Sequence, residues 1–144
     1  MNILKEIKPS IILVDDDADD QQLLLQAFQR LTDKYQISTV SSCKNLLELL
    51  SATTDNKLPC LIVLDYNMPG TNGKQALQIL QNNRRYKSIP KVIYSTGSEG
   101  LDRKEFLSLG AKDYLVKPNS IKEIVDSARK MLEHCHHQTE VMVQ

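Results

Sequence analysis

The stretch LIVLDYNMPG, residues 61–70, decides the fold. Four apolar residues, rich in branched side chains, lead into one carboxylate, Asp65, and then into turn-forming residues. A short apolar run without polar alternation is typical of a strand buried on both faces, as in a parallel sheet. Pro69 and Gly70 prevent the strand from continuing. We therefore place Asp65 at the carboxyl end of a central strand, although this stretch alone favours the ordinary role of an aspartate that caps a turn.

Length and composition are those of one globular domain. The chain has 144 residues, of which 41% are hydrophobic and 25% charged. Lys plus Arg and Asp plus Glu number 18 each, so the net charge of zero gives no support for a nucleic-acid or membrane-surface partner. No apolar run approaches the roughly 18 residues of a membrane span, and residues 1–10 lack a signal-peptide core.

Three cysteines, Cys43, Cys60 and Cys135, are odd in number and include no C-x-x-C pair. This pattern predicts reduced thiols and a cytoplasmic location rather than a disulfide framework. The cluster at residues 134–137, His-Cys-His-His, lacks the spacing of a metal site.

Strand and helix patterns alternate along the chain. Apolar runs predict five strands, at residues 11–14, 37–42, 61–65, 92–94 and 113–116. Amphipathic segments between and after them predict five helices. This alternation indicates a single α/β domain, a doubly wound and mostly parallel five-stranded sheet without a second domain.

Several residues suit helix ends or loops rather than a functional site. Asp17 is expected to lie on the surface or to cap the first helix rather than to join the acidic cluster, and Gly110 is expected to end the fourth helix. Ser120 and Glu123 have the spacing of a capping box, and Arg84-Arg85 is interpreted as a solvated helix end. The inner face of the last helix is expected to hold Ile121, Ile124, Val125, Ala128 and Leu132.

Polar residues follow four of the predicted strands at the point where each ends. They are Asp15, Asp16 and Asp17 after the first strand, Asp65 after the third, Ser95 and Thr96 after the fourth, and Lys117 after the fifth. Because parallel strands bring their carboxyl ends to one edge, these side chains are expected to converge on one pocket.

The chemistry of such a pocket follows from its residue types. Clustered carboxylates repel one another, which raises a pKa or recruits a counter-ion. Oxygen ligands in an incomplete cage suit Mg²⁺. A carboxylate can act as a nucleophile and form an aspartyl-phosphate, assisted by a metal, a lysine ammonium and a hydroxyl donor.

Four segments together resemble the receiver domain of two-component response regulators. They are VDD at 14–16, LDYNMPG at 64–70, Ser95-Thr96, and DYLVKP at 113–118, at intervals that also match the family. The resemblance covers residues 9–134 and implies the flavodoxin-like strand order 2-1-3-4-5. Residues 135–144 are expected to form a disordered C-terminal tail.

The resemblance implies a role for each acid at the site. Asp65 matches the residue that accepts a phosphoryl group from a histidine kinase or a histidine phosphotransfer protein. Asp16 matches a direct Mg²⁺ ligand, and Asp15 a neighbour that acts through water. Asn67 matches the residue whose backbone carbonyl completes the protein's share of a metal shell that also includes Asp65.

Four further positions carry over from the family. Lys117 matches the lysine that pairs with the acceptor and then with the phosphoryl group, and Pro118 its usual cis-proline. Ser95 matches the switch hydroxyl, where threonine is more frequent, and Tyr114 the aromatic residue whose rotamer reports phosphorylation. Thr96 stands where a smaller residue is common.

These features predict a stand-alone, cytoplasmic receiver that is a signalling protein rather than an enzyme, although it catalyses its own phosphorylation and dephosphorylation with Mg²⁺. Its output is expected at an unidentified protein target, and a homodimer stays open. A scaffold without phosphotransfer is the alternative, disfavoured by the complete set of acids, hydroxyl and lysine. A flavodoxin-like cofactor binder is disfavoured because no phosphate-binding loop follows the first strand.

Overall fold

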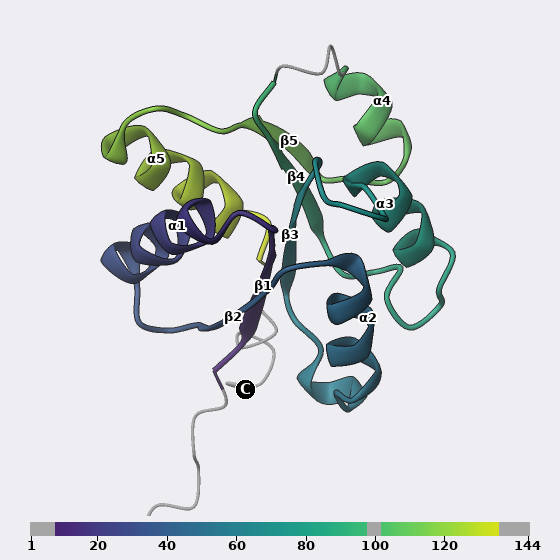
Figure 1. Ribbon diagram of the computed structural model, residues 1–144. Helices are drawn as coiled ribbons and strands as arrows, with labels where there is room; N and C mark the ends of the chain where they lie inside the picture. The colour runs from purple at the N-terminus through teal and green to yellow at the C-terminus, as the bar shows by residue number, and fades with distance from the viewer. Residues whose placement is uncertain (1–7, 98–101, 136–144) are drawn as a thin grey trace, which may run out of the picture.

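One five-stranded parallel sheet forms the centre of the molecule (Figure 1). The computed structural model describes residues 8–97 and 102–135. The sheet has the order β2-β1-β3-β4-β5, which confirms the predicted fold class. The strands are β1 (Ser10–Val14), β2 (Gln36–Val40), β3 (Leu61–Asp65), β4 (Lys91–Ser95) and β5 (Asp113–Val116). Within the described ranges, no helix combines the length and the apolar character needed to cross a membrane.

Helices cover both faces of the sheet. The five α-helices of the described ranges are α1 (Ala18–Leu31), α2 (Cys43–Ser51), α3 (Gly73–Gln81), α4 (Arg103–Ser108) and α5 (Ile121–Leu132), with a short 3₁₀-helix at Asp55–Lys57. In Figure 1, α1 and α5 lie on one face and α2, α3 and α4 on the other. All residues of β3 are buried, because Leu61 and Val63 pack towards α1 and α5 while Ile62 and Leu64 pack towards the other three helices.

Helix ends follow the sequence signals closely. Asp17 caps α1, its carboxylate accepting a hydrogen bond from the Asp20 N–H at 3.0 Å, as expected. Gly110 has a φ of +106° just after α4, a conformation that favours glycine at a helix end. Ser120 caps α5, but the Glu123 carboxylate contacts the Ser120 hydroxyl at 2.9 Å, so only half of the predicted capping box is seen.

Two side chains differ from their predicted surroundings. Ile121 is 55% exposed at the start of α5, so its assignment to the inner face was wrong; Met131 is buried there instead. Arg85 is not a solvated helix end. Its guanidinium donates to Asp55 Oδ1 at 2.5 Å, to the Leu50 carbonyl at 2.9 Å and to the Thr53 carbonyl. Arg85 therefore fixes the connection between α2 and β3 to the segment that leads into β4.

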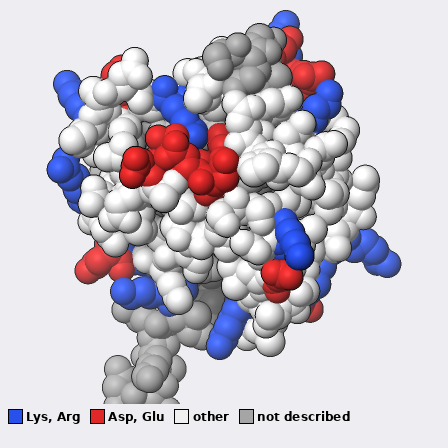
Figure 2. Space-filling view, in the orientation of Figure 1, with Lys and Arg blue, Asp and Glu red and all other residues white. Residues whose placement is uncertain are grey.

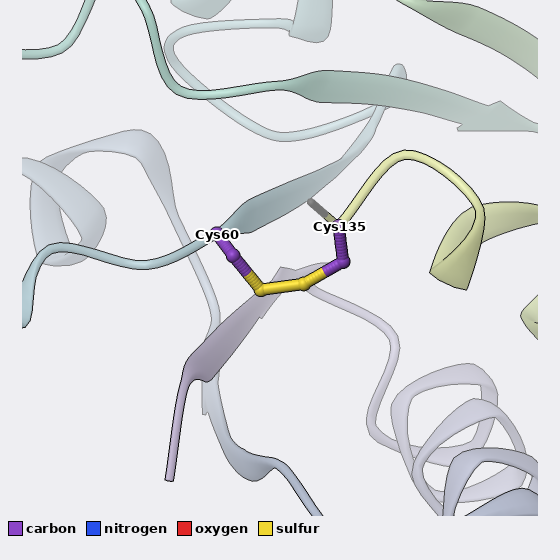
Figure 3. The surroundings of a disulfide bond; sticks show 2 residues. All are labelled: Cys60 and Cys135. Atoms are coloured by element: carbon purple, nitrogen blue, oxygen red, sulfur yellow. A yellow bond between two sulfur atoms is a disulfide. The ribbon is translucent and has the colours of Figure 1, made fainter. Parts of the chain in front are cut away.

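A disulfide joins Cys60, just before β3, to Cys135, just after α5 (Figure 3). Their Cα atoms are 5.1 Å apart, within the usual range for a disulfide. The prediction of three reduced thiols is therefore wrong for this pair, because the fold brings together two cysteines 75 residues apart in the sequence. The argument from cysteine content for a reducing compartment no longer holds.

The disulfide also changes the expected boundary of the tail. Cys135, the first residue of the predicted disordered segment, is 7% exposed. It belongs to the hydrophobic core that α1 and α5 form with one face of the sheet. Ordered structure thus includes Cys135, while the remaining residues of that segment, 136–144, lie outside the described residues.

Reduction of the disulfide should lower the free energy of unfolding by about 4 kcal/mol, because the bond closes a loop of 75 residues in the unfolded chain. Urea unfolding of the parent with and without a thiol reductant measures the difference. Cys60→Ser, with Cys43 left intact, is the control and should show no dependence on reductant. A parent whose stability is unchanged by the reductant would contradict the structural role of this bond.

Candidate functional site

The carboxyl ends of four strands bring the predicted site residues together. Asp15 follows β1, Asp65 ends β3, Ser95 ends β4 and Lys117 follows β5. Asp15, Asp65 and Ser95 are buried, with exposed fractions of 6%, 4% and 0%. Figure 2 shows acidic side chains gathered in one patch on this face, at the place where β1 ends in Figure 1.

Three carboxylates form a group that fits a divalent cation. One carboxylate oxygen from each of Asp15, Asp16 and Asp65 lies within 4.8 Å of the other two. Asp16 is exposed whereas the other two are buried, so the group opens to solvent on one side. An all-oxygen donor set with room for water suits a hard cation such as Mg²⁺ better than a soft one.

Burial changes the charge balance of the two inner acids. Burial and, second to it, the negative charge of Asp15 raise the pKa of the Asp65 carboxyl to about 7, although Lys117 opposes both effects. Burial also raises the pKa of Asp15, although hydrogen bonds from Lys117 and from the Asp17 N–H oppose this effect. Keeping both acids ionised therefore requires positive charge nearby, from Lys117 or from a cation.

Lys117 supplies positive charge to three carboxylates. Its Nζ lies 2.8 Å from Asp15 Oδ2, 2.8 Å from Asp20 Oδ2 and 3.2 Å from Asp65 Oδ1. Burial disfavours the ammonium, but the hydrogen bonds to Asp15 and Asp20 prevail and raise the pKa of Lys117 above its usual value. The sequence predicted the Lys117–Asp65 pair and missed Asp20, since an acid in the first turn of a helix is ordinarily explained by the helix dipole.

The predicted switch residues lie on β4 and β5. Ser95 accepts a hydrogen bond on Oγ from the Gly97 N–H at 3.2 Å, and its carbonyl accepts one from the Lys117 N–H at 2.6 Å. Tyr114 is 8% exposed. Its ring stacks on Phe106 of α4 with centroids 5.4 Å apart, and Phe106 in turn meets the edge of Tyr66 at 5.8 Å. A row of aromatic rings thus connects β5 with the residue next to Asp65.

The family model of the response regulator receiver domain matches residues 11–129. The chain belongs to this family. Receiver domains are modules of two-component signalling. The acids, hydroxyl and lysine that converge at the edge of the sheet are therefore those of a signalling domain.

Known relatives share the receiver domain at moderate identity. The chain is 32% identical to the transcriptional regulatory protein BaeR of Escherichia coli O6:H1, over 98% of this chain and 55% of BaeR. It is 31% identical to the two-component response regulator ORR3 of Oryza sativa subsp. indica, over 78% of this chain and 82% of ORR3. It thus spans about half the length of BaeR and four fifths of ORR3.

A solved structure shows the same fold. The phosphorylated cyanobacterial phytochrome response regulator RcpA superposes with a TM-score of 0.78 at 23% identity, over 90% of this chain and 94% of RcpA. At this identity the likeness concerns the arrangement of strands and helices.

Two further positions predicted from the receiver family, Asn67 and Pro118, lie in loops. Asn67 is exposed in the loop after β3, two residues beyond Asp65, so its predicted metal role is compatible with its place and stays a prediction. The cis-proline expected at Pro118 was wrong, because every peptide bond in the described part of the chain is trans.

Gly73, the first residue of α3, is a position that the sequence reasoning missed. Its N–H donates to the Tyr66 carbonyl at 2.8 Å, which holds α3 directly against the end of β3. A Cβ at this position would lie 2.8 Å from both the Asp65 carbonyl oxygen and the Tyr66 Cα. A helix-starting glycine in sequence carries no signal of this close approach, because the contact is with backbone.

We expect Gly73→Ala to lower the free energy of unfolding by about 1–3 kcal/mol, since the methyl group must displace the backbone beside Asp65. The loss should appear despite the better helix propensity of alanine, and thermal or urea unfolding measures it. Gly70→Asn is the control: a Cβ there meets nothing within 4 Å, so any loss of stability comes only from the φ of +83°, which asparagine adopts more readily than most residues. If Gly73→Ala is as stable as the parent, the close contact is not a constraint.

Proposed function

We propose that Asp65 accepts a phosphoryl group from the phosphohistidine of a histidine kinase or of a phosphotransfer protein. The observation that carries the proposal is the position of the Asp65 carboxylate, buried at the end of β3 between two further acids and the ammonium of Lys117. An Asp65 oxygen forms the new bond to phosphorus while the bond from phosphorus to the histidine nitrogen breaks.

The side chains around Asp65 fit separate tasks in this transfer. Asp65 must be ionised to attack, and Lys117 at 3.2 Å favours the ionised form in a site where burial opposes it. The same ammonium can then bind an oxygen of the phosphoryl group as a point charge. Ser95, fully buried at the end of the neighbouring strand, supplies a hydroxyl for a second hydrogen bond.

The carboxylates of Asp15, Asp16 and Asp65 and the backbone carbonyl of Asn67 would hold Mg²⁺ in this proposal. The cation would neutralise the phosphoryl oxygens and the charges of the three acids. The oxygen-only donor set and the exposed side at Asp16 support this choice.

Signal output follows from movement at Ser95 and Tyr114. A phosphoryl group on Asp65 adds charge that attracts the Ser95 hydroxyl, and the space that it leaves lets Tyr114 reorient. Tyr114 stacks on Phe106, so its movement would change how α4 packs on β5. Val116, the last residue of β5, exposes its apolar side chain (53% exposed), which suits recognition by a protein partner.

Acetyl phosphate with Mg²⁺ should give the parent one phosphate adduct by intact mass, and Asp65→Asn should give none. EDTA should prevent the adduct in the parent, because the acids need the cation. Asp19→Asn is the control, since Asp19 is an exposed acid of the same region and should leave the adduct intact. An adduct that persists in Asp65→Asn would identify another acceptor; no adduct in the parent would favour a scaffold without phosphotransfer.

Ser95→Ala should keep phosphorylation but lose the coupling to Tyr114. A hydrogen bond to a charged group contributes about 1.5–3 kcal/mol, enough to shift a two-state equilibrium more than tenfold. Fluoroberyllate can mimic the phosphoryl group, and NMR shifts at Tyr114 and along β5 and α5 report the response. Ser95→Thr, which keeps the hydroxyl, is the control and should respond like the parent. Equal shift changes in Ser95→Ala would remove the hydroxyl from the mechanism.

A further inference from the structure

The ammonium of Lys117 is closer to Asp20 than to the proposed phosphoacceptor. Nζ donates hydrogen bonds to Asp15 Oδ2 and Asp20 Oδ2, both at 2.8 Å, whereas its distance to Asp65 Oδ1 is 3.2 Å. The Lys117 side chain is 11% exposed and that of Asp20 is 36% exposed, so their contact is partly shielded from solvent. Asp20 therefore competes directly for the Lys117 ammonium, which a phosphoryl group on Asp65 would need.

Local structure holds Asp20 in this position. Its backbone N–H donates to the capping carboxylate of Asp17 at 3.0 Å, which fixes the first turn of α1. The next residue, Gln21, donates from Nε2 to the Val40 carbonyl at 2.6 Å, which ties the same turn to the end of β2. On the other side of the contact, Lys117 Nζ lies 5.7 Å from the centroid of the Tyr94 ring. Both partners of the ion pair are thus oriented before any phosphoryl group arrives.

Asp20 differs from Asp15 in its relation to a cation. Asp15 belongs to the group of three carboxylates that can hold a metal, so a bound cation would take up much of its charge. Asp20 does not belong to that group. With a cation in place, Asp20 is the carboxylate that still retains Lys117 beside the site.

We infer, resting on the proposed function, that Asp20 is a positioning residue that holds the Lys117 ammonium and thereby weakens the phosphorylated state of Asp65. A phosphoryl oxygen on Asp65 must draw the ammonium towards itself and away from Asp20. The free energy of the Asp20–Lys117 contact is then lost, or shared, on phosphorylation. Asp20 in this way sets how strongly the receiver retains its phosphoryl group.

Asp19 offers a matched control for this inference. Both Asp19 and Asp20 lie in the first turn of α1, so replacing either by asparagine removes one negative charge and one favourable interaction with the helix dipole. Asp19 is exposed, and among the described contacts Lys117 pairs with Asp20 and not with Asp19. A difference between the two variants therefore isolates the contact with Lys117.

The experiment measures the affinity for fluoroberyllate, at saturating Mg²⁺, of the parent, Asp20→Asn and Asp19→Asn. Asp20→Asn should bind roughly threefold to tenfold more tightly than the parent, the size expected for a partly screened charge contact, and Asp19→Asn should bind within about twofold of it. Equal changes in the two variants, or weaker binding by Asp20→Asn, would overturn the inference. A parent that binds no fluoroberyllate at all would instead overturn the proposed function.

A second readout follows the lysine itself. The Hε–Cε NMR signal of Lys117 in the free Asp20→Asn protein should move towards its position in the parent bound to fluoroberyllate, because the ammonium is released towards Asp65. In Asp19→Asn it should stay at the position of the free parent. An unmoved Lys117 signal in Asp20→Asn would show that the contact does not position the lysine. Asp20→Ala serves as the second variant, and thermal unfolding confirms that each protein is folded.

Discussion

The rest of the site depends on the burial of two carboxylates, Asp15 and Asp65, at the end of a parallel sheet. One ammonium, that of Lys117, contacts both of them and also the carboxylate of Asp20. Asp15 and Asp65 are held out of water by the same strands that form the core, and burial raises the pKa of both. Lys117 reduces this cost by donating to Asp15 and Asp20 while lying 3.2 Å from Asp65. Because one ammonium faces three carboxylates, positive charge at this site is scarce, and under the proposed function a phosphoryl group on Asp65 would draw Lys117 away from its other partners.

The surroundings determine which parts can move. Gly73 places α3 directly against the backbone of Asp65, so the backbone at this position has little room to shift. The backbone of Lys117 is fixed by the hydrogen bond from its N–H to the Ser95 carbonyl. Its side-chain ammonium contacts three different carboxylates. The aromatic row from Tyr66 through Phe106 to Tyr114 connects the end of β3 to α4 and β5. Under the proposed function, a response at a distance would pass through these side chains.

The segment from Lys117 to Cys135 is tied to β3 at both ends. Lys117, ahead of α5, forms an ion pair with Asp65 at the carboxyl end of β3, and Cys135, behind α5, is bonded to Cys60 at the amino end. The face of α5 between these points packs with α1 on the core through residues such as Ala128 and Met131. The covalent bond holds one end permanently, whereas the ion pair at the other end depends on the charge state of Asp65.

Local sequence determined the elements of this receiver domain and the set of residues at their ends. Leu61 to Leu64 predicted a buried central strand because four apolar residues in a row suit a strand covered on both faces, and parallel strands necessarily gather Asp15, Asp65, Ser95 and Lys117 at one edge. Asp17 and Gly110 carried their roles in their own chemistry, as a helix cap and as a residue with positive φ. Tertiary structure alone decided the pairing of Cys60 with Cys135, the closeness of Gly73 to Asp65, and the choice of Asp20 as a partner of Lys117. Two of these contacts join side chains that are far apart in the chain, and the third brings backbone against backbone. No periodicity or spacing in the sequence encodes such a distance.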